Sequence, residues 1–133
     1  MNNKELVSLA LKAREFSYSP YSQFSVGAAL LCADMSVYTG CNIESVAFSP
    51  TICAERTAIA KAVSDGKKDF VKIAVVGGKG DEIRNYCTPC GVCRQTLAEF
   101  CKPDFEIILA KGNGEIKIVT LRDLLPLAFS ELD

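Results

Sequence analysis

Two cysteine-containing segments, each at the expected start of a helix, most constrain how this chain can fold. Cys53 opens a helical pattern over 53–64, and Cys90 and Cys93 form a C-x2-C pair where another helical pattern begins, at 91–100. Such a pair at the start of a helix can direct two thiolates toward one metal ion. If Cys53 reaches the same ion, the positive ends of two helices must meet there, and those ends stabilise thiolates. We therefore expect two helices to begin at one metal centre.

The other segments alternate between helical and strand patterns. Asn2 and Glu5 form a capping-box pattern that predicts a first helix over 3–16. The turns at 34–36 and 111–114 are too short for a crossover, so each must join an antiparallel pair. The chain is predicted to be a single three-layer α/β domain over 1–133, with helices on both faces of a mixed five-stranded sheet. The strands are expected at 24–32, 37–43, 70–76, 105–110 and 116–119, with a loop over 77–89 and a short last helix between Thr120 and Pro126.

Glu55 adds a proton carrier to this metal centre. Three cysteine ligands leave a fourth tetrahedral position open, as in catalytic rather than structural zinc sites. Glu55 follows Cys53 by two residues, so its carboxylate can reach that position without binding the ion and can exchange protons with a water there. The chain has no histidine, so no imidazole can act as ligand or base. Segments 53–55 and 89–93 match the Cys/His-x-Glu and Pro-Cys-x-x-Cys pattern of zinc deaminases.

The composition argues against several classes of protein. The formal net charge is −1 and the basic residues are scattered, which opposes a strong electrostatic grip on nucleic acid. The amino end lacks the apolar region of a signal peptide, and the longest apolar stretch, 26–33, is too short to span a bilayer. Seven cysteines indicate metal binding or catalysis rather than disulfides. We expect a cytoplasmic protein that acts on a small molecule, without nucleic-acid or membrane partners.

Four cysteines fall outside the predicted metal set. Cys87 is open to two interpretations, because with Cys90 and Cys93 it makes C-x2-C-x2-C. It could be the fourth thiolate of a structural zinc site that also includes Cys53. It could instead belong to a ferredoxin-type iron–sulfur motif, although the last cysteine of that motif is missing. Neither alternative explains the spacing of Glu55. The other three are expected to be structural thiols in strands or at a helix end: Cys32, Cys41 and Cys101.

Five segments resemble the homotetrameric cytidine deaminases, short enzymes with a three-cysteine zinc site. They follow the family's order over nearly the whole chain: PYSQFSVGAAL (20–30), GCNIE (40–44), CAERTA (53–58), PCGVCRQ (89–95) and LLPLAF (124–129). The resemblance implies the cytidine deaminase-like fold, with one Zn²⁺ per chain held by Cys53, Cys90 and Cys93. It also implies hydrolytic deamination of free cytidine and 2′-deoxycytidine in pyrimidine salvage. Glu55 would move the protons while water attacks C4 and ammonia leaves.

The same resemblance assigns the contacts to the substrate. Asn42 and Glu44 would hydrogen-bond the ribose, and Phe24 would pack on the pyrimidine and the ribose. The backbone amide of Ala54 would meet the carbonyl of the base. Phe129 would reach into the site of a neighbouring subunit, so the homotetramer would be part of the active site.

Two arginines follow the ligand-bearing helix starts. Three thiolates leave a net negative charge on a zinc centre, so the metal is a poorer Lewis acid than one held by imidazoles. We hypothesise that Arg56, and also Arg94, draws electron density from the sulfurs and restores part of that acidity.

The sequence departs from the family pattern at two positions. Thr88 stands where relatives often have serine and Phe48 where many have tyrosine, and neither change affects the predicted metal ligands.

Three other functions compete with cytidine deamination. They are a deaminase for a blasticidin-type nucleoside antibiotic, a polynucleotide editor, and an iron–sulfur or structural-zinc module. The sugar-binding pattern favours cytidine over the antibiotic. The negative charge and the helix-free link between the last two strands oppose an editor.

Overall fold

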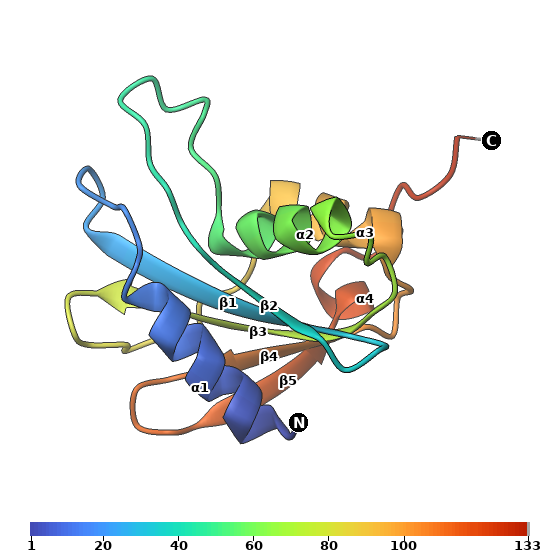
Figure 1. Ribbon diagram of the computed structural model, residues 1–133, viewed down its shortest axis with the longest axis horizontal. Helices are drawn as coiled ribbons and strands as arrows, with labels where there is room; N and C mark the ends of the chain where they lie inside the picture. Colours follow the sequence, from blue (N-terminus) through green and yellow to red (C-terminus); the bar gives the residue numbers. More distant parts are fainter. Residues whose placement is uncertain (133) are drawn as a thin grey trace.

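A computed structural model describes residues 1–132 as a five-stranded sheet flanked by helices (Figure 1). The strand order is β2-β1-β3-β4-β5; β3 and β4 are parallel, and the other neighbours are antiparallel. The predicted mixed sheet is therefore confirmed. Asp133, the last residue of the domain predicted over 1–133, lies outside the described residues. In chain order the elements are α1 (Asn3–Arg14), β1 (Phe24–Cys32), β2 (Val37–Cys41), α2 (Ala54–Ser64), β3 (Phe70–Lys79), α3 (Gly91–Phe100), β4 (Glu106–Ala110), β5 (Ile116–Thr120) and α4 (Leu121–Leu124).

Helices cover both faces of the sheet. Figure 1 shows α1 on one side and α2, α3 and α4 on the other. In β1, alternate residues belong to different apolar clusters: Leu30 packs with α2 and α3, whereas Leu31 packs with α1. Because β1 is buried on both faces, its sequence is apolar at nearly every position. The predicted three-layer arrangement is confirmed.

The strand directions explain why two helices begin at one place. β2 and β3 are both antiparallel to β1, so they run in the same direction, and β4 is parallel to β3. α2 follows β2, and α3 follows β3. Helices that follow parallel strands begin beyond the carboxyl ends of those strands, where α/β folds commonly form their sites. The topology therefore brings the N-termini of α2 and α3 to the same edge of the sheet.

The largest error in the predicted elements concerns β3. The sequence predicts a strand over 70–76 and a loop over 77–89, but β3 continues to Lys79 because Gly77 and Gly78 pair with Val26 and Ser25 of β1. The strand predicted over 37–43 ends at Cys41 and continues as isolated bridges at Ile43. The helix predicted over 3–16 ends at Arg14.

Gly40 allows α2 to lie directly against β2. A Cβ atom at this position would lie 2.4 Å from the carbonyl oxygen of Ala54 and 2.6 Å from the amide nitrogen of Ala58. Both distances are far below van der Waals contact, so a side chain here would push away the first turn of α2. A glycine in β2 thus sets the position of a helix that carries predicted site residues.

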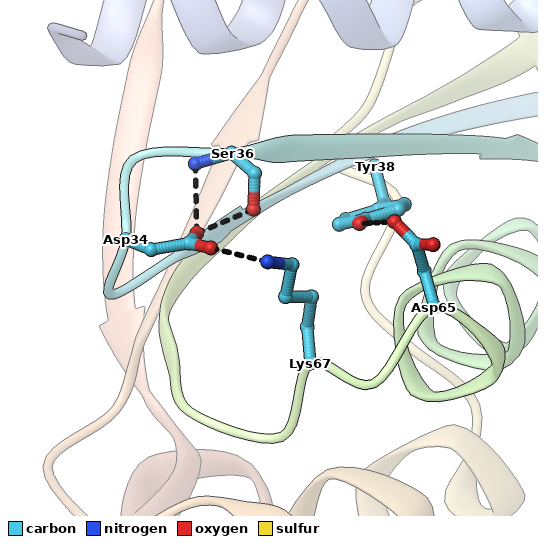
Figure 2. A network of polar contacts seen from close by, with 5 residues as sticks. All are labelled: Asp34, Ser36, Tyr38, Asp65 and Lys67. Carbon is cyan, nitrogen blue, oxygen red and sulfur yellow. Dashed lines mark hydrogen bonds and ion pairs between the residues drawn. The ribbon is translucent and has the colours of Figure 1, made fainter.

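Polar contacts connect the C-terminal end of α2 to β2 and to the turn before it (Figure 2). The Lys67 ammonium pairs with the Asp34 carboxylate at 2.6 Å, and the Tyr38 hydroxyl donates to Asp65 at the end of α2. The Ser36 hydroxyl and backbone amide both donate to Asp34, and Lys67 and Ser36 together hold the pKa of that carboxyl below its usual range. The contacts join the turn between β1 and β2 to the loop after α2. The contribution of the Asp34 contacts to stability is present at neutral pH and is lost in acid, as Asp34 takes up a proton.

Within the part of the chain that the structure describes, no helix is long and apolar enough to cross a bilayer.

Candidate active site and metal centre

The three predicted ligand cysteines meet at the N-termini of α2 and α3. Cys53 is the N-cap residue of α2, Cys90 is the N-cap residue of α3, and Cys93 lies in the first turn of α3. Their sulfur atoms lie within 4.8 Å of one another, and those of Cys53 and Cys90 are 3.6 Å apart. Neither N-cap side chain accepts a capping hydrogen bond from the backbone of its helix, although that position favours Ser, Thr, Asp or Asn. Both positions break the local rule for a helix start, as functional positions often do.

The chemistry of the cluster fits a divalent metal ion. Hydrogen bonds from Cys93, Arg56 and Cys90 lower the pKa of the Cys53 thiol to about 5, against the opposing effect of burial. The Cys93 thiol, which donates to Cys53 and is buried, has a raised pKa. Three sulfur anions so close together repel one another, so all three can ionise only around a cation. Three thiolates within reach of one point are a donor set that Zn²⁺ prefers.

Cys87 lies outside this cluster. Within residues 1–132, the sulfur atoms that lie close enough to share an ion are those of Cys53, Cys90 and Cys93. Burial, together with the smaller effect of nearby negative groups, raises the pKa of the Cys87 thiol to about 12. Its position, rather than its pKa, separates Cys87 from the metal set, because the pKa of Cys93 within the cluster is raised as well. The arrangement favours a three-cysteine site over a four-thiolate one.

Glu55 is buried beside the cysteines in the first turn of α2. Its side chain is 3% exposed, and burial raises its pKa to about 6, with the nearby negative charge of Cys53 acting in the same direction. A hydrogen bond with Cys93 opposes the shift. A carboxyl group that titrates near neutral pH can both accept and return a proton under working conditions. The arrangement can therefore support proton transfer next to the metal centre.

A cavity of about 350 Å³ opens over the cluster and Glu55. This volume falls within the usual range for small-molecule sites. The sequence assigns roles to many of the lining residues, and the structure adds others to which it assigns none, among them Ser22, Thr51 and Ile52. The full lining is Ser22, Phe24, Val26, Asn42, Glu44, Thr51, Ile52, Cys53, Ala54, Glu55, Cys87, Thr88 and Cys90.

Phe24, Asn42, Glu44 and Ala54 all reach the cavity wall, as the family resemblance implies. Ala54 is the first residue of α2, so its N–H has no partner within the helix and is free to meet an acceptor in the cavity. Asn42 and Glu44 also bind the segment over 17–26, an internal role that the sequence does not reveal.

The two arginines differ in their contacts. Arg56 donates from Nη2 to the sulfur of Cys53 at 3.6 Å, as the tuning hypothesis requires. Arg94 instead donates to the backbone carbonyls of Pro89 at 2.7 Å and Leu124 at 2.8 Å. It therefore contacts the loop that leads to Cys90 and the end of α4 rather than a sulfur atom of the cluster.

Phe129 lies outside the cavity formed by its own chain. Its side chain is 66% exposed, and its backbone carbonyl accepts a hydrogen bond from the Gln95 side chain at 2.7 Å. Nearby Leu127 is fully exposed. An exposed aromatic side chain on a segment fastened to α3 is available to a neighbouring molecule.

Comparison with known proteins identifies the family. Residues 1–109 match the family described as "Cytidine and deoxycytidylate deaminase zinc-binding region". A cytidine deaminase from Sporosarcina psychrophila is 48% identical over 133 residues, which cover 100% of this chain and 95% of the relative. Blasticidin-S deaminase from Bacillus cereus is 31% identical over 130 residues, covering 95% of this chain and 91% of the relative.

A solved structure agrees with the sequence comparison. The crystal structure of cytidine deaminase from Burkholderia pseudomallei superimposes with a TM-score of 0.89 at 42% identity, covering 97% of this chain and 100% of that one. The likeness spans the sheet, the helices and the segments that carry the three cysteines. This chain therefore belongs to the cytidine and deoxycytidylate deaminase family of zinc-binding enzymes.

Proposed function

We propose that this enzyme converts free cytidine and 2′-deoxycytidine to uridine and 2′-deoxyuridine by hydrolysis, with release of ammonia. The observation that carries the proposal is the burial of Glu55 beside the three-cysteine cluster, in the wall of a cavity large enough for a small molecule. A zinc deaminase needs a metal site with an open position and a carboxylic acid beside it that is not a ligand. The names of the similar proteins supply the nucleoside.

In this proposal Cys53, Cys90 and Cys93 hold one Zn²⁺ per chain. The ion, when bound, supplies the Lewis acidity that makes a water molecule a good nucleophile near neutral pH. Glu55 takes one proton from the attacking water and delivers it to N3. It then takes the second proton, from the hydroxyl now on C4, and delivers it to the departing amino group, so that the C4 carbonyl forms as ammonia leaves. The pKa of Glu55, raised to about 6 by burial, suits a group that must act first as base and then as acid.

The cavity wall orients the substrate in the same proposal. Phe24 packs on the pyrimidine and the ribose, and the Ala54 amide donates to the base carbonyl. Asn42 and Glu44 bind the sugar. All four residues line the cavity that Glu55 enters, which supports these roles. A site that binds both the base and the sugar holds C4 in place for attack by water, and this positioning contributes to the reaction rate.

Substitution of Arg56 tests whether this side chain tunes the acidity of the metal centre. We expect Arg56→Ala to lower kcat roughly ten-fold and to move the acidic limb of the pH profile to higher pH, because the Cys53 sulfur would lose its only charged donor within the described chain. Steady-state kinetics across pH would measure both effects. Arg122→Ala, at an exposed position of α4, should change neither. An unchanged turnover and pH profile in Arg56→Ala would refute the tuning role.

Phe129 tests the proposed homotetramer with shared sites. We expect Phe129→Ala to raise the KM for cytidine about ten-fold or more, because a buried aromatic contact would be lost at the subunit interface. Phe16→Ala removes another exposed ring, after α1, and should leave KM unchanged. Mixing Phe129→Ala with inactive Glu55→Gln subunits should restore sites of normal KM. Sedimentation should give four chains per particle, and a monomer with normal KM would contradict the shared site.

The substrate class can be tested with a panel of compounds. Cytidine and 2′-deoxycytidine should be deaminated, whereas cytosine, blasticidin S and a short cytosine-containing oligonucleotide should react far more slowly. Blasticidin S is the informative competitor, because one relative carries that activity in its name. Preferential turnover of blasticidin S would replace the proposed substrate. We propose that this reaction serves pyrimidine salvage. The seven free cysteines support a reducing compartment such as the cytoplasm.

A further inference from the structure

Ser22, a residue of the cavity wall to which the proposed function assigns no role, binds the carboxylate of Glu44. Glu44 Oε1 accepts from the backbone amides of Tyr21 at 3.0 Å and Ser22 at 3.1 Å. Glu44 Oε2 accepts from the Ser22 hydroxyl at 2.5 Å. A carboxylate offers about four acceptor positions. Over residues 1–132, three of them are therefore filled, and the one left open is on Oε2.

The hydrogen-bonding positions of the Asn42 side chain are occupied to a similar degree. Its Oδ1 accepts from the Val26 amide at 2.9 Å and from the Ser17 hydroxyl at 2.5 Å. Its Nδ2 donates one hydrogen to the Phe24 carbonyl at 2.8 Å. A side-chain amide has two N–H donors, so in the described chain one donor of Asn42 stays open.

The open positions on Asn42 and Glu44 match a single hydroxyl group. A hydroxyl donates one hydrogen and accepts through its lone pairs, so it can bind one acceptor and one donor at once. A second hydroxyl would need another acceptor on Glu44, and the Ser22 hydroxyl occupies it. We propose that Ser22 is a specificity-determining residue that limits Glu44 to one sugar hydroxyl and so makes the enzyme indifferent to the 2′ position. This inference rests on the proposed cytidine deaminase function.

The Ser22 hydroxyl is also held in place from its other side. Its oxygen accepts from the backbone amide of Phe24 at 3.0 Å, so rotation away from Glu44 would break two hydrogen bonds. Gln23, between them, has a φ of 57°, in the left-handed region, and this tight turn brings the two groups together. Hydrogen bonds from Ser22 and Tyr21 hold the pKa of Glu44 below its ordinary value, so the carboxylate stays an ionised acceptor.

The segments concerned lie close together in the fold. The chain between α1 and β1 and the chain between β2 and α2 extend beyond the same end of the sheet (Figure 1). Backbone hydrogen bonds join them, because Tyr18 donates to the Asn42 carbonyl at 3.0 Å and Glu44 donates to the Tyr18 carbonyl at 2.9 Å. Ser22 and Glu44 are therefore positioned by a fixed backbone frame.

The test compares two substrates that differ only at the 2′ position. Wild-type enzyme should have similar kcat/KM values for cytidine and 2′-deoxycytidine. In Ser22→Ala the vacated acceptor on Glu44 can take the 2′-hydroxyl, so the ratio of kcat/KM for cytidine to that for 2′-deoxycytidine should rise roughly ten-fold. Ser22→Thr keeps the hydroxyl and should keep the wild-type ratio. Ser19→Ala deletes a hydroxyl from the same segment that bonds to other serines, and it should also leave the ratio unchanged.

The ratio separates the inference from general damage to the site. A shift of Phe24 would lower kcat/KM for both substrates equally, whereas the inference requires a change in their ratio. If Ser22→Ala folds poorly, Ser22→Cys keeps the size with only a weak donor and should show the same rise. A ratio that is unchanged or lower in these variants overturns the role of Ser22 and leaves the proposed function intact. Failure of the wild-type enzyme to deaminate either nucleoside overturns the proposed function itself.

Discussion

Glu55→Gln is expected to retain zinc and to lower kcat for cytidine about 10³-fold, within the range that general acid–base catalysis contributes. Glutamine has nearly the same shape and can fill the same buried space beside the cysteines, but it cannot take a proton from water or return one to the pyrimidine. The metal donors are unchanged by the substitution. The loss should therefore fall on kcat, with KM changed much less.

Three measurements on the same preparation would test this prediction. Metal analysis should give one zinc per chain, thermal unfolding should show an intact fold, and an absorbance assay should show the loss of turnover. Glu99→Gln, on the exposed side of α3, is the matched control and should keep wild-type activity. If kcat in Glu55→Gln stayed within ten-fold of wild type, Glu55 would not be the proton carrier.

Cys90→Ser is expected to abolish both zinc retention and activity. A serine hydroxyl stays protonated near neutral pH and is a poor ligand for Zn²⁺, so two thiolates would remain where three are needed. Zinc content after dialysis should fall from about one per chain to a small fraction, and kcat/KM should fall to background. Because a ligand that binds only the folded state stabilises it by mass action, the unfolding temperature should also fall and should no longer respond to added zinc.

Cys87→Ser is the matched comparison for this experiment. Cys87 lines the same cavity but lies outside the cluster, and burial keeps its thiol protonated. The variant should therefore retain one zinc per chain and the zinc-dependent rise in unfolding temperature. Loss of zinc from Cys87→Ser, or full zinc retention by Cys90→Ser, would mean that the ligand set has been assigned wrongly.

The metal cluster could be predicted from the sequence because its signals are local. Cys53, Cys90 and Cys93 each stand where a helical pattern begins, and the structure confirms that two helix starts bring them together. The antiparallel pair of β4 and β5 was equally predictable, since its short turn permits no crossover. Short-range spacing determines both features.

Features that depend on partners far along the chain were not predictable. Gly77 and Gly78 belong to a strand because β1 pairs with them across the sheet, although glycines alone indicate a loop. The Leu124 carbonyl reaches Arg94 through the packing of α3 against α4, which the neighbours of Arg94 in sequence do not reveal. In the same way, nothing near Ser22 in the sequence indicates its bond to Glu44, which lies 22 residues away.

The most direct measurement of the central claim is the conversion of cytidine to uridine by zinc-loaded and zinc-stripped protein. The zinc-loaded enzyme should release one ammonia for each uridine formed. Removal of the metal with a chelator should stop the reaction, and one equivalent of zinc per chain should restore it. No conversion by protein that holds one zinc per chain, or equal conversion by the stripped protein, would contradict a zinc-dependent cytidine deaminase built on these three cysteines and Glu55.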